Sequence, residues 1–152
     1  MDWNNDEFKI PAILALNLVL SLGTVFLHTC AGSVVHHIAS HMIARIRNAP
    51  TILQETAIVS SVVVILSAFH FLEVLLWGLA MLMLGAVKNA PDAFYYSLTT
   101  YTTLGATDVD FDQRFRALAG FESLLGPLMI AWSTAALATV LSRLLSLKLA
   151  KK

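Results

Sequence analysis

Residues 93–112, AFYYSLTTYTTLGATDVDFD, are the stretch of this 152-residue sequence that decides its fold. They lie between two long apolar segments, yet they are too polar to cross a membrane and too apolar for an ordinary exposed loop. Gly105 follows a cluster of threonines and precedes three acids at alternate positions: Thr99, Thr100, Thr102 and Thr103 come before it, and Asp108, Asp110 and Asp112 after it. Non-helical backbone survives at membrane depth only when it is buried in protein or lines a water-filled path. We therefore predict a re-entrant segment, with a short helix that leads into an extended strand.

The composition is that of a membrane protein. Hydrophobic residues make up 57% of the chain and charged residues only 13%, and the mean hydropathy is +0.73. Ten basic residues balance ten acidic ones, so the charge shows none of the basic excess of nucleic-acid-binding proteins. The single cysteine, Cys30, excludes a disulfide within the chain. We interpret it as a small packing residue.

Three apolar segments are long enough to cross a bilayer as helices, which takes about 20 residues. The first begins at Pro11 and ends near Cys30, the second covers about 56–87, and the third covers about 115–147. Within the third, the pair Gly126-Pro127 predicts a bend, because proline removes a helical hydrogen bond and glycine loosens the helix. We expect an all-α membrane protein with three transmembrane helices and one re-entrant loop over 89–112.

Gly32 separates the first span from residues 33–50, whose apolar residues recur at helical spacing. We predict a separate amphipathic helix on the membrane surface, with Arg45 and Arg47 near anionic lipid head groups. His37 and His41 are spaced i,i+4, which suits a metal site or a pH sensor. No acid or cysteine lies nearby, so solvated histidines are the favoured interpretation. We accordingly divide the chain into an N-terminal part, 1–54, and a second part, 55–152.

His70 and Glu73 lie near the middle of the second span, three positions apart and therefore close on one helix surface. Ionisable groups at that depth are costly and should face protein or water. A paired cluster that fixes helix packing is favoured over a proton-sensitive latch near the short helix. Glu122, in the third span, also needs a partner, for which we favour the backbone of the short helix or strand over Arg114 or Arg116.

Charge predicts the orientation of the chain in the membrane. The 32–55 connection and the C-terminus carry bases, whereas the N-terminus and the re-entrant loop carry an excess of acids; the groups that decide are Arg45, Arg47, Arg143, Lys148, Lys151 and Lys152 against Asp2, Asp6, Glu7, Asp108, Asp110 and Asp112. Because basic segments stay in the cytoplasm, we expect the N-terminus and the re-entrant loop outside and the C-terminus inside the cell membrane.

The re-entrant stretch has the features of an ion-selectivity filter. Such a filter replaces the water around a cation with rings of oxygen atoms, mostly backbone carbonyls from several chains. Glycine serves where φ is positive, a threonine hydroxyl can add an oxygen, and a helix C-terminus aimed at the cavity favours a cation. Thr103, Leu104 and Gly105 fit this scheme, and the acids beyond them either concentrate cations or merely solvate a loop.

In these residues the sequence resembles the potassium-channel pore-domain family. AFYYSLTTYTTLGATD is similar to the pore helix and filter of its two-transmembrane bacterial channels, whose filter reads TVGYGD, and TAALAT at 134–139 is similar to their inner helix. The resemblance covers about 56–147 and implies a homotetramer with no resident cofactor, only permeant potassium and sodium. It implies ion coordination by Thr103, Leu104, Gly105, Ala106 and Thr107; filter support from Tyr95, Tyr96, Thr99, Thr100 and Glu122; and a hinge and cavity at Gly126, Pro127, Ile130, Thr134 and Ala138.

Two filter positions depart from the family. Ala106 stands where an aromatic residue is usual, and Thr107 stands where the second glycine is usual. A β-branched residue tolerates positive φ poorly, so we expect strain or a wider path at Thr107. The same stretch is similar to the TIGET filter of weakly selective cyclic nucleotide-gated channels. The sequence thus predicts a cation channel with reduced potassium selectivity; the alternatives are a strictly selective channel, a non-conducting scaffold, and a metal-binding membrane subunit that uses His70 and Glu73.

Overall fold

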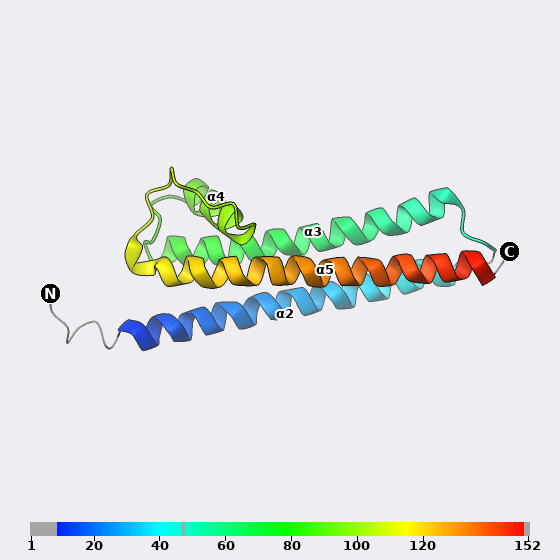
Figure 1. Ribbon diagram of the computed structural model, residues 1–152, viewed down its shortest axis with the longest axis horizontal. Coiled ribbons are helices and arrows are strands. Elements are labelled where there is room, and N and C mark those ends of the chain that lie inside the picture. The colour runs from blue at the N-terminus through cyan, green and yellow to red at the C-terminus, as the bar shows by residue number, and fades with distance from the viewer. Residues whose placement is uncertain (1–8, 47, 151–152) are drawn as a thin grey trace.

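The computed structural model describes residues 9–46 and 48–150, and they form a bundle of three long helices with one short helix against it. The elements in chain order are α2 (Lys9–Ala44), α3 (Ile52–Met83), α4 (Ala90–Tyr101), the 3₁₀ turn η1 (Gln113–Phe115) and α5 (Arg116–Ala150). The three long helices run side by side, and each contacts the other two. Helix α4 lies at one end of the bundle, where it packs on α3 and α5 (Figure 1).

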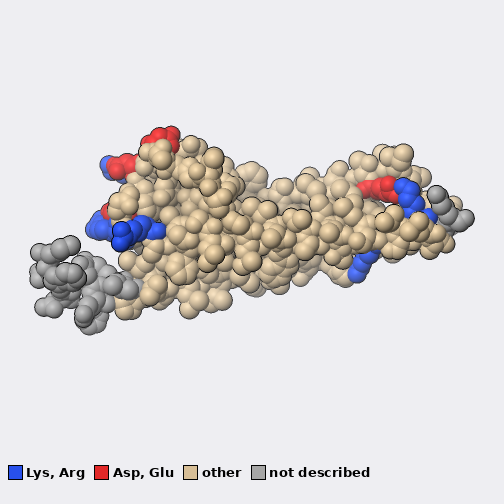
Figure 2. Space-filling model, viewed as in Figure 1, with Lys and Arg blue, Asp and Glu red and all other residues tan. Residues whose placement is uncertain are grey.

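All three long helices can span a membrane by length and composition, as the sequence predicts. The apolar segments cover Pro11–Ala44, Ile52–Met83 and Gln113–Ala150, and an 18-residue stretch within each has a mean hydropathy of 1.9, 2.2 and 1.8, respectively. At about 1.5 Å per residue, each exceeds the roughly 30 Å of hydrocarbon. Lysine, arginine and acidic side chains gather at the two ends of the molecule and leave the middle of the visible face bare (Figure 2). The chain is therefore an all-α, multi-pass membrane protein.

Helix α2 corrects one prediction, because it runs without interruption from Lys9 to Ala44. The separate surface helix predicted over 33–50 is wrong. Val35 and Ala39 are buried in an apolar cluster that includes Val62 of α3 and Val140 of α5, so this part of the helix packs on the bundle. A glycine within a helix destabilises it by only about 1 kcal/mol, which is less than the stabilisation that burial of Val35 and Ala39 provides. Gly32 therefore does not end the helix.

The connection between α2 and α3 is short, and its chemistry explains where α3 starts. Thr51 Oγ1 accepts a hydrogen bond from Gln54 N at 3.3 Å, and Gln54 Oε1 accepts one from Thr51 N at 3.0 Å. This reciprocal capping box satisfies amide groups that the first helical turn leaves free. Helix α3 thus begins at Ile52, before the predicted start near Thr56, and it ends at Met83.

Helix α5 continues through the pair Gly126-Pro127, and Figure 1 shows no sharp bend there. The pair therefore does not interrupt the helix. The predictions of orientation and lipid binding rest in part on residues outside the described ones, namely the acidic N-terminus, Arg47 and the terminal lysines.

Candidate functional site

Helix α4 begins at a defined cap and packs closely on α3. Asn89 Oδ1 accepts a hydrogen bond from Asp92 N at 2.9 Å, and Pro91 lies in the first turn. Both features favour the start of a helix. Gly78 of α3 allows the close approach, because a Cβ at that position would lie 3.1 Å from the carbonyl oxygen of Ala93. The helix therefore has a fixed position at the end of the bundle.

The segment after α4 folds back on the last turn of that helix through backbone hydrogen bonds. Thr103 N donates to Thr100 O at 2.9 Å, and Gly105 N donates to Thr99 O at 3.0 Å. Thr99 and Thr100 are buried, whereas Thr103, Leu104 and Gly105 are exposed on this single chain. The side chain of Leu104 is 79% exposed.

The backbone at this segment differs from the prediction in one respect. Among the described residues, the positive φ values are +62° at Thr103, +71° at Gly85 and +75° at Gly105. Thr107 is not among them, so the strain predicted at that residue is wrong. Thr103 carries it instead, because it follows the end of α4, where a left-handed residue commonly closes a helix.

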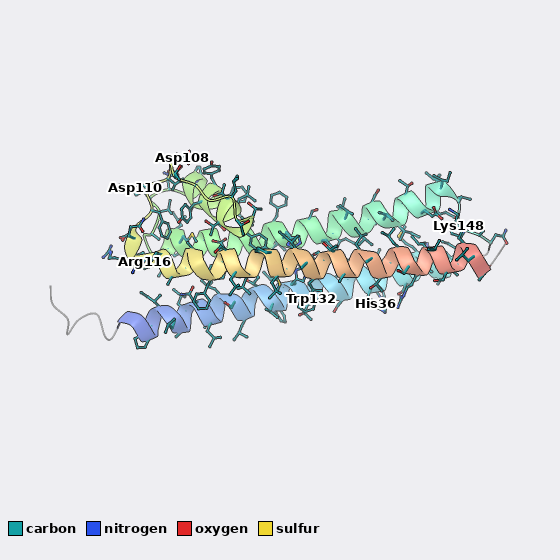
Figure 3. All side chains as sticks on the ribbon, viewed as in Figure 1. His36, Asp108, Asp110, Arg116, Trp132 and Lys148 are labelled. Carbon is teal, nitrogen blue, oxygen red and sulfur yellow. The ribbon has the colours of Figure 1, made fainter. Side chains whose placement is uncertain are left out.

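The three acids beyond the segment have different surroundings. Asp110 forms an ion pair with Lys88 at 2.5 Å, and Asp112 accepts hydrogen bonds from the side chain and the amide of Arg114. Those bonds hold the pKa of the Asp112 carboxyl below its usual value, and Asp110 raises the pKa of Lys88. In the described part of the chain, Asp108 makes no such contact, and it lies at the edge of the molecule beside α4 (Figure 3). Of these three acids, Asp108 is therefore the one without a compensating charge among the described residues.

The tyrosines of α4 take different positions. The ring of Tyr96 stacks on Phe111, with 4.4 Å between centroids and 5° between planes, and so ties α4 to the returning loop. Tyr95 is 44% exposed. Tyr101 is buried and directs its hydroxyl group toward α3, away from residues 103–107.

Gly126 brings α5 against the end of α4. A Cβ on Gly126 would lie 1.9 Å from the carbonyl oxygen of Tyr101 and 2.8 Å from its carbonyl carbon. Only glycine fits at such a distance. The sequence predicts a hinge at this position, and the structure shows that α5 packs here directly against the backbone of α4.

Glu122 braces α4 through the side chain of Ser97. The sequence predicts a contact with the backbone of the short helix or strand instead, and that detail is wrong. The carboxyl group is fully buried, and its Oε1 lies 2.5 Å from Ser97 Oγ. Ser97 Oγ also lies 2.8 Å from the carbonyl oxygen of Val74, which can only accept. Since a serine has one proton, both contacts are satisfied when the Glu122 carboxyl is protonated and donates to Ser97. Arg114 pairs with Asp112 and not with Glu122.

One face of α5 is left uncovered by the rest of the chain. Ile130, Thr134 and Ala138 lie on it, four positions apart, and all three are exposed. These are the residues for which the sequence predicts a cavity-facing position.

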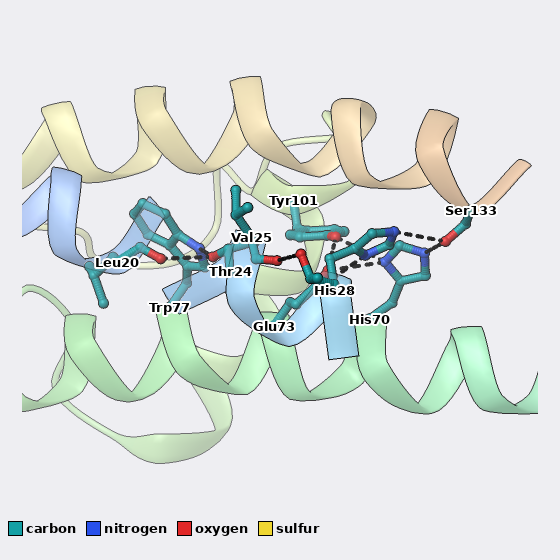
Figure 4. A network of polar contacts seen from close by, with 10 residues as sticks. Leu20, Thr24, Val25, His28, His70, Glu73, Trp77, Tyr101 and Ser133 are labelled. Atoms are coloured by element: carbon teal, nitrogen blue, oxygen red, sulfur yellow. Dashed lines mark hydrogen bonds and ion pairs between the residues drawn. The ribbon is translucent and has the colours of Figure 1, made fainter. Parts of the chain in front are cut away.

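A buried polar cluster near the C-terminal end of α4 joins α2, α3, α4 and α5 (Figure 4). Glu73 accepts hydrogen bonds from three side chains, those of His28, His70 and Tyr101, and Ser133 lies at the far side of both histidines. The pairing of His70 with Glu73 is confirmed. Sequence reasoning missed the role of His28 as a partner of Glu73. A histidine in one apolar span and a glutamate in the next could have suggested that the two side chains pair.

Comparison with known proteins identifies the domain that contains this geometry. Residues 69–143 match the profile of the ion channel family, which covers the C-terminal part of α3, all of α4, the loop after it and most of α5. No curated protein and no solved structure matched the chain. The matched region is a channel domain and not an enzyme. Residues 69–143 of this chain are therefore similar to the ion channel family.

Proposed function

We propose that four copies of this chain assemble around a central pore and conduct monovalent cations, potassium among them, with reduced selectivity over sodium. The observation that carries the proposal is the segment Thr103–Ala106. It is anchored at Thr99 and Thr100 by backbone hydrogen bonds, yet it is largely exposed in one chain. A filter needs this combination, because its carbonyl groups must be fixed and must also face an axis that no single chain supplies.

The uncovered face of α5 supports the same assembly. Ile130, Thr134 and Ala138 are exposed on the side that a four-fold arrangement would turn toward a water-filled cavity. Identical chains close into rings through cyclic symmetry. Four copies would place four filter segments around one axis, with the C-terminal end of each α4, the negative end of its dipole, near the cavity.

Reduced selectivity follows from Ala106 and Thr107. The methyl group of Ala106 cannot pack behind the filter as an aromatic ring would, and Tyr101 does not replace it, because its hydroxyl group is directed to Glu73. The inner positions, Thr103 to Gly105, keep their backbone anchors. We infer two inner coordination levels with a wider outer path.

Reversal potentials in liposomes or planar bilayers, with potassium on one side and sodium on the other, test selectivity. The double change Ala106→Tyr with Thr107→Gly should shift the reversal potential toward that of potassium. A wild-type channel that already excludes sodium, or a double variant with unchanged permeability ratios, would contradict the account of Ala106 and Thr107.

A matched pair of glycines tests whether the segment is the filter at all. Gly105 and Gly85 have φ values of +75° and +71°, and an added Cβ meets nothing within 4 Å at either position in the single chain. Alanine therefore costs a similar backbone strain of about 1 kcal/mol at both. Gly105→Ala should abolish or strongly alter conduction, whereas Gly85→Ala should leave it intact. Equal effects on conduction would refute the assignment.

We also propose that the end bearing Asp108 faces the outside of the cell membrane. Its uncompensated charge is placed to raise the local cation concentration at the pore mouth. Asp108→Asn should lower single-channel conductance at low salt and have less effect at high salt, since salt screens the charge. An impermeant thiol reagent that labels Asp108→Cys only in opened vesicles, and never in intact cells, would refute this orientation. Binding of anionic lipid near Arg45 stays a prediction.

A further inference from the structure

We propose that His28, His70 and Glu73 form a binding site for one divalent transition-metal ion, of which Zn²⁺ is the best match. The site joins α2 to α3 and lies against α4 and α5 (Figure 4). It is independent of ion conduction by the filter. The sequence favours a chain without a resident metal and keeps a metal site at His70 and Glu73 only as an alternative. It does not reveal that His28 meets those two residues.

The donor atoms have the identity and the spacing that the ion requires. His28 Nδ1 lies 2.9 Å from Glu73 Oε1, and His70 Nδ1 lies 3.2 Å from Glu73 Oε2. One donor atom from each residue falls within 4.8 Å of the others. Zinc bonds to nitrogen and oxygen of about 2.0–2.1 Å place tetrahedral ligands roughly 3.3 Å apart. The ion can therefore replace the hydrogen-bonded protons with small side-chain movements.

Ser133 supplies the support that ligating histidines need. Its Oγ lies 2.9 Å from His70 Nε2 and 3.4 Å from His28 Nε2. Metal-bound histidines usually donate their second ring N–H to an oxygen, which fixes the tautomer. A serine oxygen has two lone pairs, so it can accept from both rings. When the ion binds, each imidazole stays neutral: its ring proton moves from Nδ1 to Nε2, and the Nε2–H group donates to Ser133.

Tyr101 completes the surroundings of the carboxylate. Its hydroxyl group donates to Glu73 and also lies 2.9 Å from His70 Nδ1. The group thereby orients the Glu73 carboxylate for the ion, and it stands next to the fourth coordination position. Water can fill that position.

The site is buried but has an entrance. The side chains of His28 and Glu73 are 2% and 0% exposed, whereas that of His70 is 21% exposed. A cavity of about 210 Å³ reaches His70 and Tyr101 between α3, α4 and α5. It provides a path for the ion and room for a water ligand. A buried carboxylate in a membrane span needs a compensating charge, and a divalent cation supplies it.

The other histidine pair of α2 provides a matched control. His37 and His41 stack, with 6.5 Å between ring centroids. Both are exposed, and among the described residues no third ligand gathers with them. They resemble the proposed ligands in chemistry but lack the carboxylate and the supporting serine.

Direct metal measurements on the full chain in detergent test the proposal. After treatment with a chelator and reloading, we expect one Zn²⁺ per chain. The Co²⁺ form should show the visible absorption of a four-coordinate ion, and X-ray absorption at the zinc edge should show nitrogen and oxygen ligands that include two imidazoles. These experiments use only the wild-type chain. Absence of stoichiometric binding, or a six-coordinate spectrum without imidazole, would mean a hydrogen-bonded cluster only and would overturn the proposal.

Variants then locate the site. His28→Gln and Glu73→Gln should weaken Zn²⁺ binding at least tenfold, and Ser133→Ala, which keeps all three ligands, should weaken it by about 10- to 100-fold. His37→Gln should bind like the wild type. Loss of the ion from His37→Gln, with binding retained by Ser133→Ala and Glu73→Gln, would assign the metal to the other pair and refute the site.

Discussion

Gly126→Ala is the substitution for which the structure makes the sharpest prediction. The added Cβ would lie 1.9 Å from the carbonyl oxygen of Tyr101, about 1.5 Å short of an ordinary contact that begins at 3.4 Å. The obstacle is backbone, so no side-chain rotation relieves it. Overpacking of this kind costs typically 1–3 kcal/mol, and such a short contact belongs at the upper end. Alanine returns at most about 1 kcal/mol through its better helix propensity. A net destabilisation of about 2 kcal/mol or more remains.

The same contact links stability to conduction. Tyr101 is the last residue of α4, and Thr103 follows it closely. A shift of the Tyr101 carbonyl would therefore displace the segment proposed to be the filter. We expect Gly126→Ala to lower the thermal stability of the purified assembly and to reduce potassium flux into liposomes at least tenfold.

Gly32→Ala provides the control for that experiment. Gly32 also lies within a long helix, but nothing lies within 4 Å of its added Cβ. It gains the same helix propensity without the clash, so its stability and flux should match or slightly exceed the wild type. If Gly126→Ala behaves like Gly32→Ala in both assays, the close approach of α5 to α4 is wrong.

Three further outcomes follow from single contacts. Glu122→Gln should keep normal thermal stability, because an amide can donate to the same serine of α4, whereas Glu122→Leu should lower it by about 1–3 kcal/mol. Equal stability of the two variants would show that the hydrogen bond to Ser97 does not stabilise the protein. Trp77→Phe removes the buried hydrogen bond of 2.9 Å from Trp77 Nε1 to Thr24 Oγ1. It should lower the free energy of unfolding by about 1 kcal/mol, measured by thermal denaturation, and loosen the packing of α2 on α3. Unchanged stability would show that the bond contributes nothing. Arg114 lowers the pKa of Asp112, so the local stability that this pair adds is present at neutral pH and is lost as the pH falls through the lowered pKa. In Arg114→Gln the loss should begin at higher pH, which amide hydrogen exchange at the start of η1 would measure. An unchanged exchange profile would count against the interaction.

Local sequence predicted the three long apolar helices and the short helix between the last two well, because those features depend on short-range properties. Hydropathy marks the three spans, and Asn89 with Pro91 marks the start of α4. The same approach failed at Gly32, where a glycine suggested a break. The cost of one helical glycine is small, and the packing of Val35 and Ala39 outweighs it. That packing involves α3 and α5, which no local pattern contains.

The polar residues of the spans show most clearly what only tertiary structure decides. The sequence predicts that His70, Glu73 and Glu122 need partners, since ionisable groups in a membrane are costly. It does not say that the partners are His28, 45 positions before Glu73, and Ser97 of α4. Likewise, glycine before proline suggests flexibility at Gly126, while its contact with the Tyr101 carbonyl depends on how α5 crosses α4. Composition determines which groups must be satisfied, and the packing of helices distant in sequence determines how.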